Sequence, residues 1–132
     1  MPTLFSTLPL LAGIGFVAFI LWRSFAPNRS VGGGDWIAPA LLSFAFLLWS
    51  IYAVTTGGSM GFWTEHVRNA WGNQIWFDLL LAGGVAFALM APRLRSVGMA
   101  PLPWGLLIIA TGSVGVLATY ARYLYLEARR SR

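Results

Sequence analysis

The feature that most constrains this chain is a set of four long apolar blocks that hold almost no charge. They run over about residues 4–22, 36–56, 74–91 and 103–126. An α-helix rises about 1.5 Å per residue, so each block approaches or exceeds the roughly 30 Å hydrocarbon core of a bilayer. Only 10% of the residues are charged, against about 25% in soluble domains. We therefore expect an all-α integral membrane protein, a four-helix bundle that makes residues 1–132 one transmembrane domain.

The stretch between the second and third blocks, residues 60–72, mixes aromatic, polar and charged side chains. On a helix, Trp63, Val67, Ala70 and Trp71 would share one face. This pattern predicts a short amphipathic helix that lies in the membrane interface. A plain loop is the alternative.

The arginines flank the apolar blocks, as membrane anchors do, so the net charge of +5 does not indicate a nucleic-acid-binding face. The first block has no basic residue before it and ends at Trp22 and Arg23, so we expect a helix of the mature protein rather than a signal peptide.

Four crossings would place both termini on one side. The two sides then hold nearly equal numbers of arginines, Arg23, Arg29, Arg93 and Arg95 against Arg68, Arg122, Arg129, Arg130 and Arg132. Because the basic flank of the first helix tends to stay inside, we expect a bacterial inner-membrane protein with its hairpins in the cytoplasm and its termini outside.

Several chemistries are excluded by residue type. The chain has no cysteine and a single histidine, His66, so thiolate metal sites and bis-histidine haem ligation within one chain are excluded. No phosphate-binding loop or serine nucleophile motif is present. We expect no catalytic set, no cofactor and no metal.

Two ionisable residues fall inside the apolar blocks, Asp78 near the start of the third and Arg122 near the end of the fourth. If these blocks are antiparallel helices, both side chains lie at a similar depth, and we predict that they pair. Tyr52, Glu65 and His66 would complete a polar cluster at the same face. The alternative is structural, because an acid near a helix start and a base near a helix end complement the helix dipole.

Small residues and tryptophans mark the remaining features. Thr111, Gly115 and Thr119 recur at spacing four and predict a helix-packing seam, which could also admit a partner helix or a flat lipophilic ligand. Six tryptophans fall near predicted block ends and are expected to anchor the helices at the interface: Trp22, Trp36, Trp63, Trp71, Trp76 and Trp104.

Three motifs between Phe62 and Arg130 carry a resemblance. They are N-Q-I-W-F-D-L-L, which opens the third block, R-L-R-S-V-G-M followed by L-P-W, and the ending V-G-V-L-A-T-Y-A-R-Y-L-Y-L-E-A-R-R. With these, the chain resembles an uncharacterised bacterial family of very small helical membrane proteins built on a domain of unknown function. The chain departs from that family in its extra N-terminal block and in the order of its last turn. The resemblance implies a helical membrane fold and no known activity.

The leading functional hypothesis is a non-catalytic multi-pass membrane protein, an accessory subunit of a larger complex that contacts the lipid bilayer and a membrane-protein partner or further copies of itself. One alternative is a binder or enzyme for a lipophilic molecule such as a lipid, quinone, isoprenoid or pigment, acting through Tyr52, Asp78 and Arg122. A minimal transporter is the second alternative, but Asp78 lies far from mid-block and no internal repeat is present.

Overall fold

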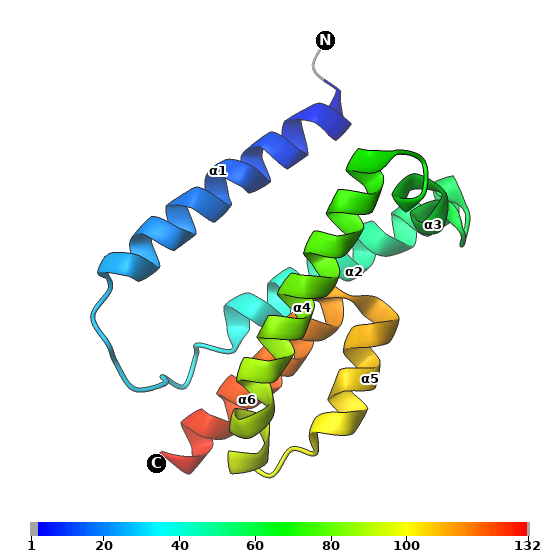
Figure 1. Ribbon diagram of the computed structural model, residues 1–132. Coiled ribbons are helices and arrows are strands. Elements are labelled where there is room, and N and C mark those ends of the chain that lie inside the picture. The colour runs from blue at the N-terminus through cyan, green and yellow to red at the C-terminus, as the bar shows by residue number, and fades with distance from the viewer. Residues whose placement is uncertain (1–2, 132) are drawn as a thin grey trace. The chain divides into compact units, whose positions relative to one another are not determined.

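The chain is all-helical in the computed structural model, which describes residues 3–131 (Figure 1). It divides into two compact units, Met1–Ser30 and Val31–Arg132. The first unit contains one helix, α1 (Leu4–Phe25). The second contains five helices: α2 (Ile37–Gly57), α3 (Gly61–His66), α4 (Ala70–Ser96), α5 (Pro101–Thr111) and α6 (Ser113–Arg130).

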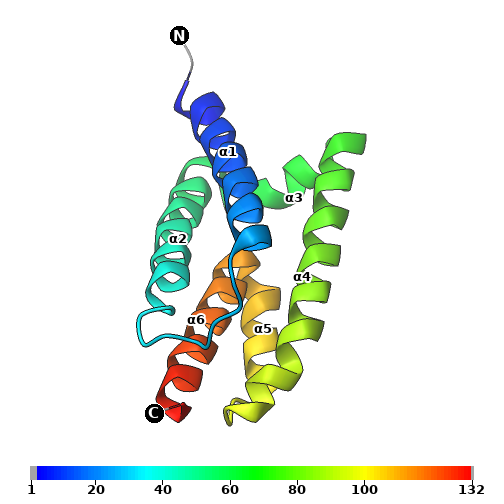
Figure 2. The same ribbon diagram turned by 90° about the vertical axis from the view of Figure 1, so that its left-hand side faces the viewer.

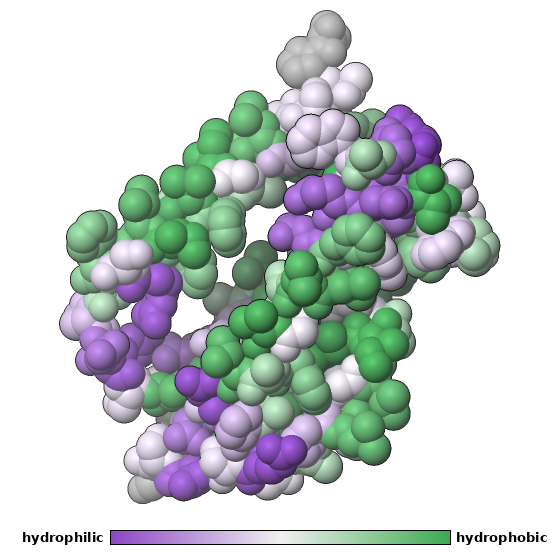
Figure 3. Space-filling model, in the orientation of Figure 1, coloured by the Kyte–Doolittle hydropathy of each residue, from purple (hydrophilic) through white to green (hydrophobic). Residues whose placement is uncertain are grey.

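Three helices are long and apolar enough to cross a membrane. They are α1, α2 and α4, with 22, 21 and 27 residues, and they correspond to the first three predicted blocks. The second unit carries hydrophobic side chains along α5 and the middle of α4, with hydrophilic side chains toward its two ends (Figure 3). These findings are those of a membrane protein with three candidate spans.

The expected fourth span over 103–126 is not one helix. The chain reverses at Gly112, where φ is 61° and ψ is −127°, a conformation that residues with a Cβ rarely adopt. α5 and α6 therefore lie side by side as a helical hairpin (Figure 2). The backbone of the turn is satisfied, because the Gly112 N–H donates to the Ile108 carbonyl (2.7 Å) and the Val116 N–H donates to the Gly112 carbonyl (3.1 Å).

Gly115 lets the two helices of this hairpin approach closely. A Cβ at Gly115 would lie 2.8 Å from the Cα of Ile108 on α5. Next along α6, Thr119 is fully buried and its hydroxyl donates to the Gly115 carbonyl (2.7 Å). The predicted seam residues thus lie at a contact between two helices, with Thr111 at the end of α5, and not along one continuous helix.

The reversal brings the end of α6 back to the end of α4, where Arg130 donates a hydrogen bond to the Ser96 carbonyl. The chain therefore returns to the side on which α5 begins. With α5 and α6 paired in this way, residues 103–126 do not form the single crossing on which the expectation of both termini on one side depended.

Helix α6 is the centre of the second unit, since α2, α4 and α5 all pack against it. The core holds Met90 and Leu94 of α4 together with Met99 of the following loop, and Tyr123 and Leu126 of α6 pack against them. α4 continues through Pro92 to Ser96, beyond residue 91, at which the third block was expected to end. The packing of Leu94, which is fully buried, offsets the hydrogen bond that Pro92 cannot donate.

Polar side chains lie at the starts of α4 and α2. Asn69 caps α4 by accepting a hydrogen bond from the Gly72 N–H (2.9 Å). Asp35 does not cap α2, because its carboxylate accepts from the Gly32 N–H of the preceding loop (2.8 Å). The predicted interfacial segment 60–72 contains α3 and then the first turn of α4.

We expect Gly112→Ala to lower the free energy of unfolding by about 1–3 kcal/mol, because alanine is strained at this positive φ. Thermal unfolding in mild detergent, followed by circular dichroism, measures the loss. Gly83→Ala is the matched control, since a Cβ at Gly83 meets no atom within 4 Å and alanine favours a helix. Equal melting temperatures for the two variants would contradict the role given to Gly112.

Candidate functional site

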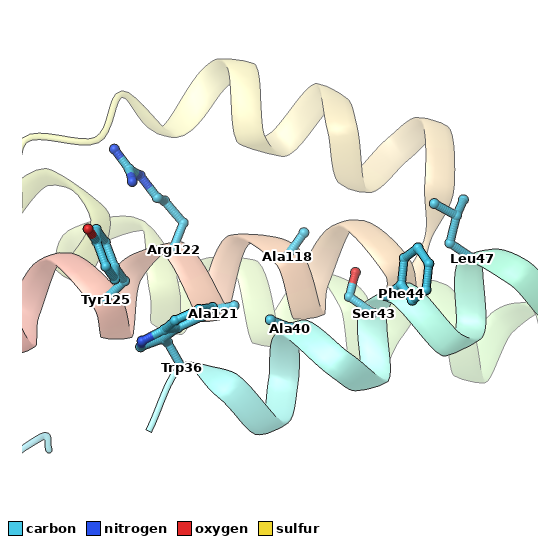
Figure 4. Close-up of a pocket in the computed structure, with 9 residues that line it drawn as sticks. All are labelled: Trp36, Ala40, Ser43, Phe44, Leu47, Ala118, Ala121, Arg122 and Tyr125. Carbon is cyan, nitrogen blue, oxygen red and sulfur yellow. The ribbon is translucent and has the colours of Figure 1, made fainter. Parts of the chain in front are cut away.

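A groove of about 500 Å³ runs between α2 and α6 (Figure 4). The residues of α2 that line it recur at helical spacing, as do those of α6, so each helix contributes one face. The groove is lined by Trp36, Ala40, Ser43, Phe44, Leu47, Ala118, Ala121, Arg122 and Tyr125. All but Ser43 and Arg122 are apolar or aromatic, so the groove can accept an apolar chain.

Small side chains keep the groove open along its middle. Ala40 of α2 and Ala118 of α6 lie between the aromatic end and Leu47 (Figure 4). The two helices are held together beside them by one buried hydrogen bond, from the Ser43 hydroxyl to the Val114 carbonyl (2.8 Å). This bond joins α2 to the tip of the α5–α6 hairpin and so fixes the spacing of the two groove walls.

The charged end of the groove is built around the ring of Tyr125. The guanidinium carbon of Arg122 lies 5.5 Å from the ring centroid and that of Arg129 lies 5.0 Å from it. The ring of Trp36 meets Tyr125 edge to face, with 5.7 Å between centroids. Within residues 3–131, neither Arg122 nor Arg129 forms an ion pair or donates a hydrogen bond. Two arginines that have no ion pair within the described residues therefore contact one aromatic ring at the groove's end.

Arg129 was not among the residues singled out from the sequence. Tyr125 lies three positions after Arg122, and Arg129 lies four positions after Tyr125. At this spacing all three residues share one side of a helix. That spacing is visible in the sequence. The spacing alone does not indicate a site, because Trp36 and the other wall of the groove come from α2, which packs alongside.

Asp78 and Arg122 are not brought together. The ends of α4 and α6 meet at Ser96 and Arg130; Asp78 lies about 27 Å before that point along α4, and Arg122 about 12 Å before it along α6. Asp78 is exposed and has no hydrogen bond or ion pair among the described residues. The reason is the turn at Gly112, which reverses the direction that the fourth block was expected to take.

The other members of the predicted polar cluster lie near the start of α4 or on α2. Glu65 forms an exposed ion pair with Arg68 (2.9 Å). The imidazole of His66 hydrogen-bonds the Phe62 carbonyl and stacks edge-on against Trp76, at 4.9 Å between centroids. Tyr52 packs on Trp49 (5.5 Å) instead.

The tryptophans predicted as anchors are placed differently from one another. Trp22 at the end of α1 is exposed beneath the Arg23 guanidinium (5.7 Å). Trp63 and Trp71 are exposed on α3 and α4. Trp104 instead packs against the core, and Trp36 lines the groove.

One further polar group lies where α4 and α6 meet. An oxygen of the Glu127 carboxylate is buried and has no hydrogen-bond partner in the described part of the chain. No group of three metal-binding side chains occurs among residues 3–131.

No protein-family model, curated protein or solved structure matches this chain. The resemblance to small bacterial membrane proteins therefore stays a prediction.

We expect Ser43→Ala to destabilise the protein by about 0.6 kcal/mol, the average for a hydrogen bond between membrane helices. Ser50→Ala is the control, because the Ser50 hydroxyl bonds only the Phe46 carbonyl of its own helix (2.8 Å). Unfolding of both variants in detergent measures the difference. A larger loss for Ser50→Ala would show that the α2–α6 bond does not hold the groove walls.

Proposed function

We propose that this chain is a non-catalytic multi-pass membrane protein that works as a subunit of a larger membrane assembly, with the first half of α4 as its docking helix. The observation that carries the proposal is Asp78, an exposed carboxylate that has no hydrogen bond or ion pair within residues 3–131. It lies on a helix long and apolar enough to span a membrane. An ionisable group facing hydrocarbon is costly, so such residues usually face a partner or a cavity.

The second unit offers Asp78 no cover. Residues 77–82 are exposed on every side of the helix, and the buried residues of α4, Met90 and Leu94, both lie in its second half. Within this unit the first half of α4 is supported by α3, while α2 does not pack on α4. Within the second unit, a whole turn of α4 around Asp78 is thus left uncovered.

The face that carries Asp78 is suited to a helix. Ala82 and Ala86 follow Asp78 at spacing four, so two small side chains continue its face toward the middle of α4. Small residues let helices approach closely in lipid. A partner helix with an arginine, lysine or amide at the depth of Asp78 would satisfy the carboxylate. Two copies of this chain paired symmetrically here would bring two carboxylates together, which disfavours a homodimer through this face.

We expect stoichiometric co-purification of a membrane-protein partner from native membranes in mild detergent, and its loss on Asp78→Leu or Ala82→Phe. Asp78→Leu removes the acceptor for the partner's donor, and Ala82→Phe blocks close approach. Mass spectrometry of the purified material identifies and counts what is bound.

Leu80→Phe is the matched control, because residue 80 lies about 200° around the helix from both Asp78 and Ala82. It should leave the partner bound. Recovery of the wild-type chain alone, or equal loss of the partner in all three variants, would overturn the docking role of this face.

We also propose that the end of the second unit formed by the last turns of α4 and α6 faces the cytoplasm. The folded second unit gathers Arg93, Arg95, Arg129 and Arg130 at this end. At its other end, the described residues hold Arg68, which is paired with Glu65. The positive-inside rule, undecided for four crossings, then favours one orientation. The C-terminal residues would lie inside, not outside as the four-crossing count implied.

This orientation predicts how single introduced cysteines are labelled. The chain has no cysteine of its own, so each label reports only the introduced residue. In intact cells whose outer membrane is permeabilised, a membrane-impermeant maleimide should modify the cysteine of the Thr64→Cys variant, which lies on α3. It should modify Ser131→Cys only after lysis. The reverse pattern would invert the orientation, and labelling of both before lysis would show that α5 and α6 cross as one span.

A further inference from the structure

We propose that the groove between α2 and α6 binds one anionic phospholipid, with an acyl chain along the groove and the phosphate at Arg122 and Arg129. The groove residues belong to α2 and α6, not to the docking half of α4, so this inference is independent of the proposed subunit role. The case has three parts: the length of the groove, its charged end and the way that end is held.

The groove has the length of one leaflet. From Trp36 to Leu47 the wall formed by α2 rises about 16 Å, close to half of a hydrocarbon core of roughly 30 Å. Phe44 and Leu47 are exposed at the deep end, so the groove is open to hydrocarbon along its side. An acyl chain entering from the bilayer would contact Ala40 and Ala118, whose small side chains leave room for it.

The cations lie at only one end of the groove. Arg122 and Arg129 flank Tyr125, which is next to Trp36 at the start of α2. Guanidinium groups present paired donors that match phosphate oxygens. Neither has a carboxylate partner among the described residues, so the charge complementarity is left for a ligand. A lipid phosphate would satisfy it where the helices reach the headgroups.

The geometry favours a bound lipid over the general tendency of arginines to reach for headgroups. Ordinary snorkelling needs only a long side chain near a helix end. Here the two guanidiniums are held against one ring, and that ring is fixed by Trp36 of another helix. An apolar groove begins at the same place. A site of this construction should distinguish an anionic lipid from a zwitterionic one and should saturate at one lipid per chain.

The test is native mass spectrometry of the full chain in detergent, titrated with phosphatidylglycerol and, separately, with phosphatidylcholine of the same chain length. We expect one saturable phosphatidylglycerol adduct with higher affinity than phosphatidylcholine. Arg122→Gln and Arg129→Gln should each weaken it about fivefold, the effect of one cation near an anionic headgroup. Ala118→Phe should abolish it with both arginines intact, because the ring fills the groove.

Arg93→Gln with Arg95→Gln is the control, since these arginines lie at the same end of the unit but do not line the groove. It should change the affinity less than twofold. Ala40→Leu fills the groove from α2 and replaces Ala118→Phe if that variant fails to fold by circular dichroism. Millimolar inorganic phosphate should not displace the lipid.

Displacement by phosphate would reduce the site to an anion site without a groove. Unchanged binding in the groove-filling variants, or equal losses for the control and the groove arginines, would show non-specific attraction to a basic surface. Each of these results overturns the proposal.

Discussion

Everything in the second unit depends on a backbone reversal at Gly112 whose polar groups stay satisfied. A turn at membrane depth is tolerated only where its N–H and C=O groups find partners. Here the Gly112 N–H is bonded to the end of α5 and its carbonyl to the start of α6. Ser43 adds a buried hydrogen bond from α2 to the hairpin tip. Without the reversal, α6 would continue away from the start of α2 and the end of α4 instead of packing between them. Neither the groove nor the cluster of arginines at the last turns of α4 and α6 would then exist.

The reversal also separates two kinds of polar chemistry. The basic end gathers arginines from α4 and α6 beside the aromatic pair Trp36 and Tyr125. The opposite end holds α3 and the Glu65–Arg68 ion pair, and Asp78 lies in the half of α4 that begins at that end. The cationic groove and the lone carboxylate are therefore independent features on different helices. In the roles proposed above, the groove binds a lipid and the carboxylate faces a partner protein.

Much of the fold could be predicted from the sequence, because the burial of long apolar blocks in lipid leaves few alternatives to helices. The first three blocks correspond to α1, α2 and α4. The prediction of a single helix over the fourth block was wrong, because Thr111, Gly112 and Ser113 lie inside an apolar run. Helical periodicity does not indicate where a chain reverses direction. The Asp78–Arg122 pair failed for the same reason, since it assumed that the last block runs straight. Arg122 still belongs to the candidate site, but its partners, Tyr125 and Trp36, come from a helix contact that no local pattern contains.

The central place of α6 has a consequence for biogenesis. This helix, on which α2, α4 and α5 all pack, is the last of the six to leave the ribosome. It carries three arginines and a glutamate, so it is poorly suited to enter the bilayer alone. In a two-stage view of membrane folding, α2 and α4 would insert first and remain separate in the lipid. The α5–α6 hairpin would then pack between them through α6. Until α6 packs, the faces of α2 and α4 that it covers have no partner within the second unit, so the interval between insertion and packing is the stage at which misassembly is favoured.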